Sequence, residues 1–254
     1  MQLSEYQSKY QGIRFLRDGG VLEMTLHTRG GPAKWGSSLD CLHAELGDAF
    51  LDVGRDPDNK VVILTGTGDS FIAEFDPAAK FPESTIAAMW ARIYGEGLAL
   101  LNNLLAIPVP MIAAVNGPAL IHAELAALAD IVLAADTAEF ADLAHVPAGG
   151  TAPGDGVHIV WPMLLGPNRG RYFLLTGERI DAQEAKRLGV VAEVLPPTAL
   201  MARARELAAQ LARLPVPMLR YTRSLLVHDL RLRMANELSS GLAHEALATL
   251  LPRG

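Results

Sequence analysis

Residues 111–136 read MIAAVNGPALIHAELAALADIVLAAD and contain two short apolar runs, MIAAV at 111–115 and the apolar centre of DIVLAAD at 130–136. Apolar runs of this length between turn residues predict buried strands. The triplet Asn116-Gly117-Pro118 is a turn signal that ends the first run. Polar residues therefore begin where a strand ends, and loops held by a rigid scaffold often carry catalytic groups.

Strand patterns alternate with helix patterns on both sides of this stretch. Ile13 and Phe15 alternate with polar residues, and Asp18-Gly19-Gly20 leads into a second run at 21–28, which predicts a hairpin. Because strands interleave with helices, the predicted fold class is α/β. The other main predicted elements are a helix capped by Ser38, a strand at 61–64, a loop at 75–85, a helix ending near Ile107 and helices after 157.

Composition restricts the classes of partner. The chain has 254 residues, a net charge of −6 and one cysteine, Cys41. This length can bury a sizeable core without disulfides, and a lone cysteine is typical of a reducing, cytoplasmic setting. The acidic balance disfavours nucleic acid, which binds clustered Lys and Arg. No uncharged apolar run approaches the roughly 20 residues that span a bilayer, so no membrane partner is expected.

Three stretches resemble the crotonase (enoyl-CoA hydratase/isomerase) superfamily. They are AAVNGPALIHAELAALADIVLAADTAEF at 113–140, VVILTGTGDSFIAEFD at 61–76 and LTGERIDAQEAKRLGVVAEVLP at 175–196. The resemblance implies an α/β spiral of β-β-α units. It further implies a core at 1–195 that carries the active site and a helical oligomerisation module at 196–254, which forms a homotrimer or a hexamer of two trimers.

The departures from the common family pattern resemble one branch of that superfamily. Leu120-Ile121-His122-Ala123 replaces the usual glycines, and His145 stands where hydratases carry a second catalytic Glu. Both changes resemble the β-diketone hydrolases, such as 6-oxocamphor hydrolase. The resemblance implies cofactor-independent hydrolysis of a carbon–carbon bond in a small, apolar, cyclic or bicyclic 1,3-diketone, by a retro-Claisen reaction that gives a keto acid.

This reaction needs a base for water, donors for the developing oxyanions and an acid for the enolate carbon. His145 is the candidate base, because a neutral imidazole has suitable basicity and the carboxylate of Asp155 can fix its tautomer. The resemblance assigns these two roles to His145 and Asp155. It also implies that His122 polarises a substrate carbonyl. It also implies that the Trp35 indole donates to a carbonyl and that Glu245 holds the attacking water.

Three further positions complete the predicted site. Glu124 occupies the place of the hydratases' first catalytic Glu and is interpreted as a supporting residue. The resemblance aligns the backbone N–H groups of Ala73 and Ile121 with the family's oxyanion-hole donors. Glycine usually lets a thioester approach closely there, so the bulk of Ile121 disfavours the common thioester pose.

Several alternatives stay open from the sequence. The first is a CoA-thioester enzyme of the same superfamily, an enoyl-CoA hydratase/isomerase or acyl-CoA hydrolase, with Lys80 or the C-terminal arginines on the CoA phosphates. A metallohydrolase, a serine hydrolase and a non-enzymatic binding protein are weaker alternatives, and no metal is expected. His145 could also be a surface-loop residue, with Asp155 only capping the helix that follows it.

Overall fold

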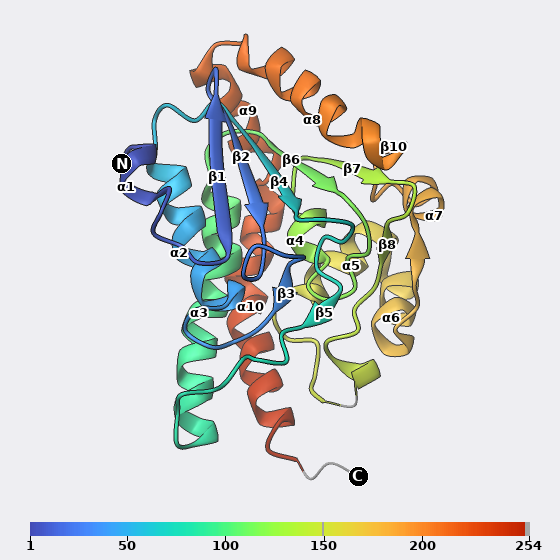
Figure 1. The fold of residues 1–254 in the computed structure, drawn as a ribbon. Coiled ribbons are helices and arrows are strands. Elements are labelled where there is room, and N and C mark those ends of the chain that lie inside the picture. The colour runs from blue at the N-terminus through green and yellow to red at the C-terminus, as the bar shows by residue number, and fades with distance from the viewer. Residues whose placement is uncertain (149, 252–254) are drawn as a thin grey trace.

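The computed structural model describes residues 1–148 and 150–251. A six-stranded sheet in the order β1-β2-β4-β6-β7-β10 forms its centre (Figure 1), which confirms the α/β class. Only the β1–β2 pair is antiparallel among the sheet's neighbours. The strands are β1 (Ile13–Asp18), β2 (Val21–Leu26), β4 (Val61–Gly66), β6 (Met111–Val115), β7 (Ile131–Ala135) and β10 (Glu193–Leu195).

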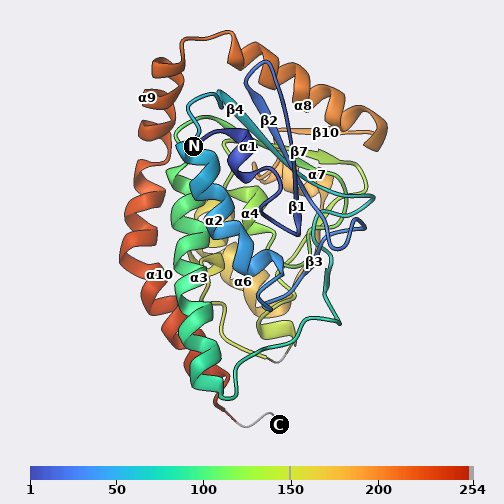
Figure 2. The ribbon, with the colours of Figure 1, turned by 60° about the vertical axis from the view of Figure 1, so that its left-hand side comes forward.

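Helices cover both faces of the sheet, so its central strands are apolar at every position rather than at alternate ones. In β4, Val62 and Leu64 join the large core, whereas Val61 and Ile63 pack with Leu200 of α8 (Pro197–Ala212). On the opposite side from α8, three long helices lie together (Figure 2). These helices are α2 (Leu42–Arg55), α3 (Ile86–Ala106) and α10 (His228–Ala248).

The predicted N-terminal hairpin is confirmed, but the predicted start of the next helix is wrong. Asp18 pairs with Val21 across a two-residue turn in which Gly19 and Gly20 have φ of 56° and 87°, a conformation that glycine adopts without strain. The helix predicted from Ser38 begins at Leu42 instead. The hydroxyl of Ser38 bonds Asp40 and Cys41, so it is not available to cap the helix.

Short elements connect these layers, and β3–β5 and β8–β9 form two small two-stranded sheets. The loop predicted at 75–85 lies between β5 and α3. The connecting elements are α1 (Leu3–Tyr6), β3 (Lys34–Trp35), β5 (Glu74–Phe75), α4 (Glu124–Ala127), β8 (Glu139–Phe140), the 3-10 helix η1 (Val146–Ala148), α5 (Val157–Leu165), α6 (Pro167–Thr176), β9 (Ile180–Asp181), α7 (Ala182–Arg187) and α9 (Val216–Leu226).

The turns that follow β4 and β6 are joined by Asn116. Its side chain accepts from the N–H of Gly66 at 3.0 Å and donates to the carbonyl oxygens of Gly68 and Ser70, both at 2.9 Å. A Cβ on Gly117 would lie 1.8 Å from the carbonyl oxygen of Asp69, so only glycine allows this approach. The Asn-Gly pair therefore fixes the loop that carries His122.

The boundary expected at 195/196 falls between β10 and α8. From there the chain covers the sheet with α8 and returns through α9 to α10, which lies beside α3 (Figure 2). Helix α10 also packs against α5. This return places the C-terminal half of α10 beside the loop around Asp155. No helix in the described residues is long and apolar enough to cross a membrane.

Candidate active site

Four side chains that are distant in the sequence line one cavity of about 500 Å³: His122, His145, Asp155 and Glu245. His122 lies in the turn before α4, His145 just before η1, Asp155 just before α5 and Glu245 in α10. The glutamate therefore comes from the same chain as the histidines.

Two glycines allow the loop of Asp155 to approach the helix of Glu245. A Cβ on Gly154 would lie 2.1 Å from the carbonyl oxygen of Gly241, and a Cβ on Gly241 would lie 2.2 Å from that of Gly154. Thr151 adds a hydrogen bond of 2.9 Å from its hydroxyl to the carbonyl oxygen of Glu245. Close backbone contact thus brings both carboxylates into the lining of the same cavity.

His145 is held by carboxylates at both ring nitrogens. Its Nδ1 lies 2.7 Å from Oδ1 of Asp142, and its Nε2 lies 3.3 Å from Oδ2 of Asp155 and 3.7 Å from Oε1 of Glu245. Only 2% of His145 is exposed, so it is not a surface-loop residue. The predicted contact between His145 and Asp155 is present and involves Nε2. The second ring nitrogen, Nδ1, contacts Asp142, which the sequence did not indicate.

His122 lies on the other side of Asp155. Its Nδ1 is 2.8 Å from Oε1 of Glu124 and 3.2 Å from Oδ2 of Asp155. Its ring stacks on Trp35, with centroids 3.8 Å apart and planes inclined by 31°. The φ of His122 is 52°, which is uncommon for a residue with a side chain and costs on the order of 1 kcal/mol. The fold holds this ring in place despite the strain.

Burial and charge shift the pKa values of the whole cluster. Burial alone would lower the pKa of His145, but Asp155, Asp142 and Glu245 outweigh it and raise that pKa. Glu124 and Asp155 raise the pKa of His122 in the same way. Burial would raise the pKa of Asp155, yet the two histidines hold it below its usual range. Burial, and then the charge of Asp155, raises the pKa of Glu245 to about 7.

The predicted oxyanion hole is not formed as expected. The N–H of Ile121 donates to the carbonyl oxygen of Ile72 at 3.1 Å, so it already has a partner. The side chain of Ile121 packs into the hydrophobic core. Neither Ile121 nor Ala73 is among the described residues that line the cavity. Glu124 is fully buried behind His122, whereas Trp35 does line the cavity.

Two residues at the site were missed by the sequence reasoning. Asp142 precedes His145 by three positions, and this Asp-x-x-His spacing is the only sequence signal for it. His43 lines the cavity from α2, with its Nδ1 2.7 Å from Oε2 of Glu96 and its ring edge-on to Trp35. Its position beside Leu42 in a helix with many buried residues resembles an ordinary core position, so the sequence alone did not single it out.

Apolar side chains form most of the remaining wall. Phe75, Phe81 and Ile86 lie towards the loop between β5 and α3, and each is about half exposed. No Lys or Arg occurs among the described lining residues, and Lys80 is not one of them. The other apolar lining residues include Met89, Trp90, Ile93 and Leu242.

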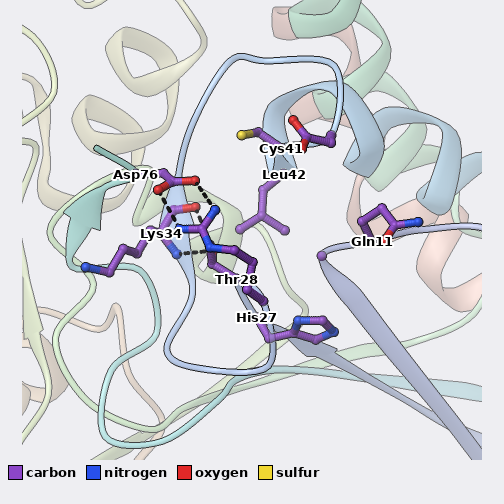
Figure 3. Close-up of a pocket in the computed structure, with 10 residues that line it drawn as sticks. Gln11, His27, Thr28, Lys34, Cys41, Leu42 and Asp76 are labelled. Carbon is purple, nitrogen blue, oxygen red and sulfur yellow. Dashed lines mark hydrogen bonds and ion pairs between the residues drawn. The ribbon is translucent and has the colours of Figure 1, made fainter. Parts of the chain in front are cut away.

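A second cavity, of about 430 Å³, has a different character. Its lining is mostly polar and comes from the segment before β1, the chain from β2 to the start of α2 and the loop after β5 (Figure 3). Arg29 forms two hydrogen bonds of 2.8 Å to Asp76, one to each carboxylate oxygen. The two charges neutralise each other, and the histidine cluster is elsewhere. We therefore place the candidate active site in the first cavity.

Some of the clustered groups also have donor atoms suited to a metal ion. The sets are His122–Glu124–Asp155 and His145–Asp155–Glu245, with the donor atoms of each set within 4.8 Å of one another. The distance of 2.8 Å between His122 and Glu124 is that of a hydrogen bond. Treatment of the protein with a chelator decides whether a metal contributes to any activity.

Stability should fall as the pH rises through neutrality, and Glu245→Gln should flatten this dependence. Folding raises the pKa of Glu245 from 4.5 to about 7, so the folded protein keeps a proton that the unfolded chain releases. This contribution is fully present below pH 4.5 and is lost as the pH passes through 7. It amounts to about 3 kcal/mol at most.

Melting temperatures measured from about pH 5 to about pH 8 test this expectation. The Glu245→Gln variant should gain several degrees relative to the wild type as the pH rises. Glu237→Gln, an exposed position on the same helix, serves as the control. A difference in Tm that stays constant over this range would contradict the expectation.

Comparisons with known proteins agree with the fold. A solved β-diketone hydrolase from the cyanobacterium Anabaena sp., bound to (S)-3-oxocyclohexyl acetic acid, is 46% identical over 96% of each chain, with a TM-score of 0.89. A solved enoyl-CoA hydratase/isomerase from Mycobacterium paratuberculosis is 28% identical and covers 96% of this chain and 95% of its own, with a TM-score of 0.86.

A curated relative suggests another chemistry. The carnitinyl-CoA dehydratase of Citrobacter koseri is 38% identical over 207 residues, which are 79% of this chain and 74% of the relative. The sequence profile of the enoyl-CoA hydratase/isomerase family matches residues 17–245. The chain therefore belongs to the enoyl-CoA hydratase/isomerase family, within the crotonase superfamily.

Proposed function

We propose that this protein hydrolyses a carbon–carbon bond in a cyclic or bicyclic 1,3-diketone and gives a keto acid, without a cofactor. The observation that carries the proposal is the cluster in which Asp155 lies between His122 and His145, with Glu245 beside them. This cluster lines a cavity whose other lining residues are largely apolar.

The cluster has the groups that a retro-Claisen hydrolysis requires. Water must lose a proton as it adds to one carbonyl, and the intermediate must then expel an enolate stabilised by the other carbonyl. Carboxylates can accept the proton, and protonated imidazoles can stabilise negative charge on the substrate oxygens. The Trp35 indole can only donate, so it can bind a carbonyl oxygen but cannot activate water.

The walls favour a small neutral substrate. A CoA ester carries phosphates that proteins usually bind with Lys or Arg, and the described lining has neither. The half-exposed Phe75, Phe81 and Ile86 suit an apolar ring system instead. The similarity to the Anabaena β-diketone hydrolase supports the same class of substrate.

A CoA-thioester reaction is the second candidate function. The similarity to carnitinyl-CoA dehydratase supports it. The hydrogen bond from Ile121 N–H to Ile72 opposes it, because a thioester oxyanion would need that donor.

One experiment separates the two candidates. The purified protein is offered a bicyclic 1,3-diketone and, separately, crotonyl-CoA and a carnitinyl-CoA, each with and without EDTA. We expect loss of diketone and formation of keto acid that EDTA does not change. Turnover of only a thioester would overturn the proposal, and diketone cleavage that EDTA abolishes would show that a metal takes part.

The His122→Ala variant should lose activity through both kcat and KM. The ring binds Asp155 and stacks on Trp35, so its removal takes away a cationic donor and loosens the indole. We expect kcat/KM to fall by about 10²-fold, measured by steady-state diketone cleavage. His228→Ala, at the start of α10 and outside the cavity, is the control. Wild-type kinetics in His122→Ala would remove this residue from the site.

We also propose that the protein is a homotrimer or a hexamer made of two trimers. The C-terminal helices carry large apolar side chains that one chain leaves exposed, including Tyr221 at 71%, Leu225 at 78% and Leu226 at 71%. Light scattering should give the mass of three or six chains, and Leu225→Asp should reduce it. A monomeric mass for the wild type would contradict this proposal.

A further inference from the structure

The surroundings of His145 indicate which protonation state it adopts. A neutral imidazole has one N–H donor and one lone pair, so it can satisfy a carboxylate at only one nitrogen. Here Asp142 lies on Nδ1 at 2.7 Å, and Asp155 lies on Nε2 at 3.3 Å. A lone pair that faced an ionised Asp155 would be repelled. The geometry therefore favours an imidazolium, which has no lone pair with which to activate water.

Glu245 is the least engaged of the four carboxylates around the two histidines. Glu124 is held by His122, Asp142 is held by His145, and Asp155 lies between both rings. Oε1 of Glu245 is 3.7 Å from Nε2 of His145, beyond hydrogen-bond distance, whereas each of the other three carboxylates has an oxygen within 3.3 Å of a histidine nitrogen.

We infer that Glu245 is the general base that takes the proton from the attacking water, and that His145 acts as an imidazolium that stabilises the oxyanion. The inference rests on the proposed function and reassigns the base, which the sequence placed at His145 with Asp155. It requires a site in which Glu245 borders the cavity beside His145, as it does here.

The proposed steps balance without a further reactant. An O–H bond of water breaks, its proton moves to Glu245, and the water oxygen bonds to the carbonyl carbon. The intermediate reforms its C=O and breaks the C–C bond, which leaves a carboxylic acid and an enolate. Protonated Glu245 then returns its proton to the enolate carbon. The new carboxylic acid releases its own proton to solvent.

The electrostatics of the pair support this division of roles. Burial, followed by the charge of Asp155, raises the pKa of Glu245 to about 7, and a general base is most effective when its pKa lies near the working pH. The surrounding carboxylates raise the pKa of His145, which keeps its ring charged.

Nitrogen NMR of the resting protein tests the state of His145 without any substrate. The chain has 7 histidines, and comparison with His145→Gln assigns the signals of this ring. We expect both ring nitrogens to carry protons at about pH 8, where an ordinary histidine is neutral. A neutral imidazole at that pH would overturn the inference, whatever the protein does to diketones.

Kinetics and chemical rescue test the role of Glu245. Glu245→Gln should lower kcat for a diketone by about 10²–10⁴-fold. In Glu245→Ala, formate should restore part of the rate in a saturable manner, and it should not accelerate His145→Ala or the wild type. Glu237→Ala, on the same helix but outside this cavity, should keep wild-type kinetics.

The possible results separate the role of Glu245 from the proposed diketone hydrolysis. Near-wild-type turnover in Glu245→Gln, or rescue of His145→Ala by imidazole together with no effect of formate on Glu245→Ala, would make His145 the base. A wild-type protein that leaves diketones intact would refute the proposed function, while the NMR result would still decide the charge on His145.

Discussion

Replacing Asp155 with Asn should lower kcat for diketone cleavage by about 10²–10³-fold. Oδ2 of Asp155 lies 3.2 Å from His122 and 3.3 Å from His145, so one negative charge supports both imidazoles. An amide keeps the shape but removes that charge. Both rings would then lose protons more easily, and the developing oxyanions would lose cationic partners. Steady-state kinetics near neutral pH, with a parallel Tm measurement, check this result.

An exposed aspartate provides the matched control. Asp136, which follows β7, is exposed, and Asp136→Asn should leave kcat unchanged. His145→Ala should resemble Asp155→Asn, because it removes one of the two charges that Asp155 supports. Neither variant should change the oligomeric state. Wild-type turnover in Asp155→Asn, with an intact fold, would remove the His122–Asp155–His145 cluster from the mechanism.

Much of the fold could be predicted because local signals agreed with it. The apolar runs of β6 and β7 are strands, and glycines with positive φ make the β1–β2 turn. The helix start at Ser38 failed because a side chain that can cap a helix can equally bond within a loop, as Ser38 does with Asp40. Propensity does not reveal which of these contacts will form.

The site was predictable in its residues more than in its contacts. His122, His145 and Asp155 lie in one stretch, so their convergence followed from the loop between strands. Which carboxylate meets which ring nitrogen depends on backbone paths, and the sequence could not distinguish Asp142 from Asp155. The oxyanion hole failed for a related reason, because the hydrogen bond from Ile121 to Ile72 depends on how two loops dock.

The approach of Glu245 to the cluster depends on the whole C-terminal return of the chain. The chain passes through the sheet, α8 and α9 before α10 places this residue beside His145. Its sequence neighbourhood is that of a partly exposed helix. Only the resemblance to known enzymes pointed to it. Contacts that close over such long separations have no local signature in the sequence.

Removing Arg223 should cause a large loss of stability. This side chain is 1% exposed and lies in α9, where its Nε donates to Oδ2 of Asp130 at 2.8 Å. Its Nη1 also donates to the carbonyl oxygens of Leu105 and Ile107, which end α3. Arg223→Ala would leave Asp130 and both carbonyls without this partner. We expect a loss of about 3–5 kcal/mol, which lowers Tm by roughly 10 °C.

The exposed pair Arg233–Asp229 on α10 is the control that shows how far the loss of stability depends on burial of the arginine. Its side chains are 49% and 70% exposed and join at 3.1 Å, so Arg233→Ala should change the free energy of unfolding by less than about 1 kcal/mol. Thermal and denaturant unfolding of both variants measures the contrast. Similar losses would mean that the contacts of Arg223 add little beyond a surface charge. A much larger loss in Arg223→Ala would show that it anchors α9 and, with it, the helix that carries Glu245.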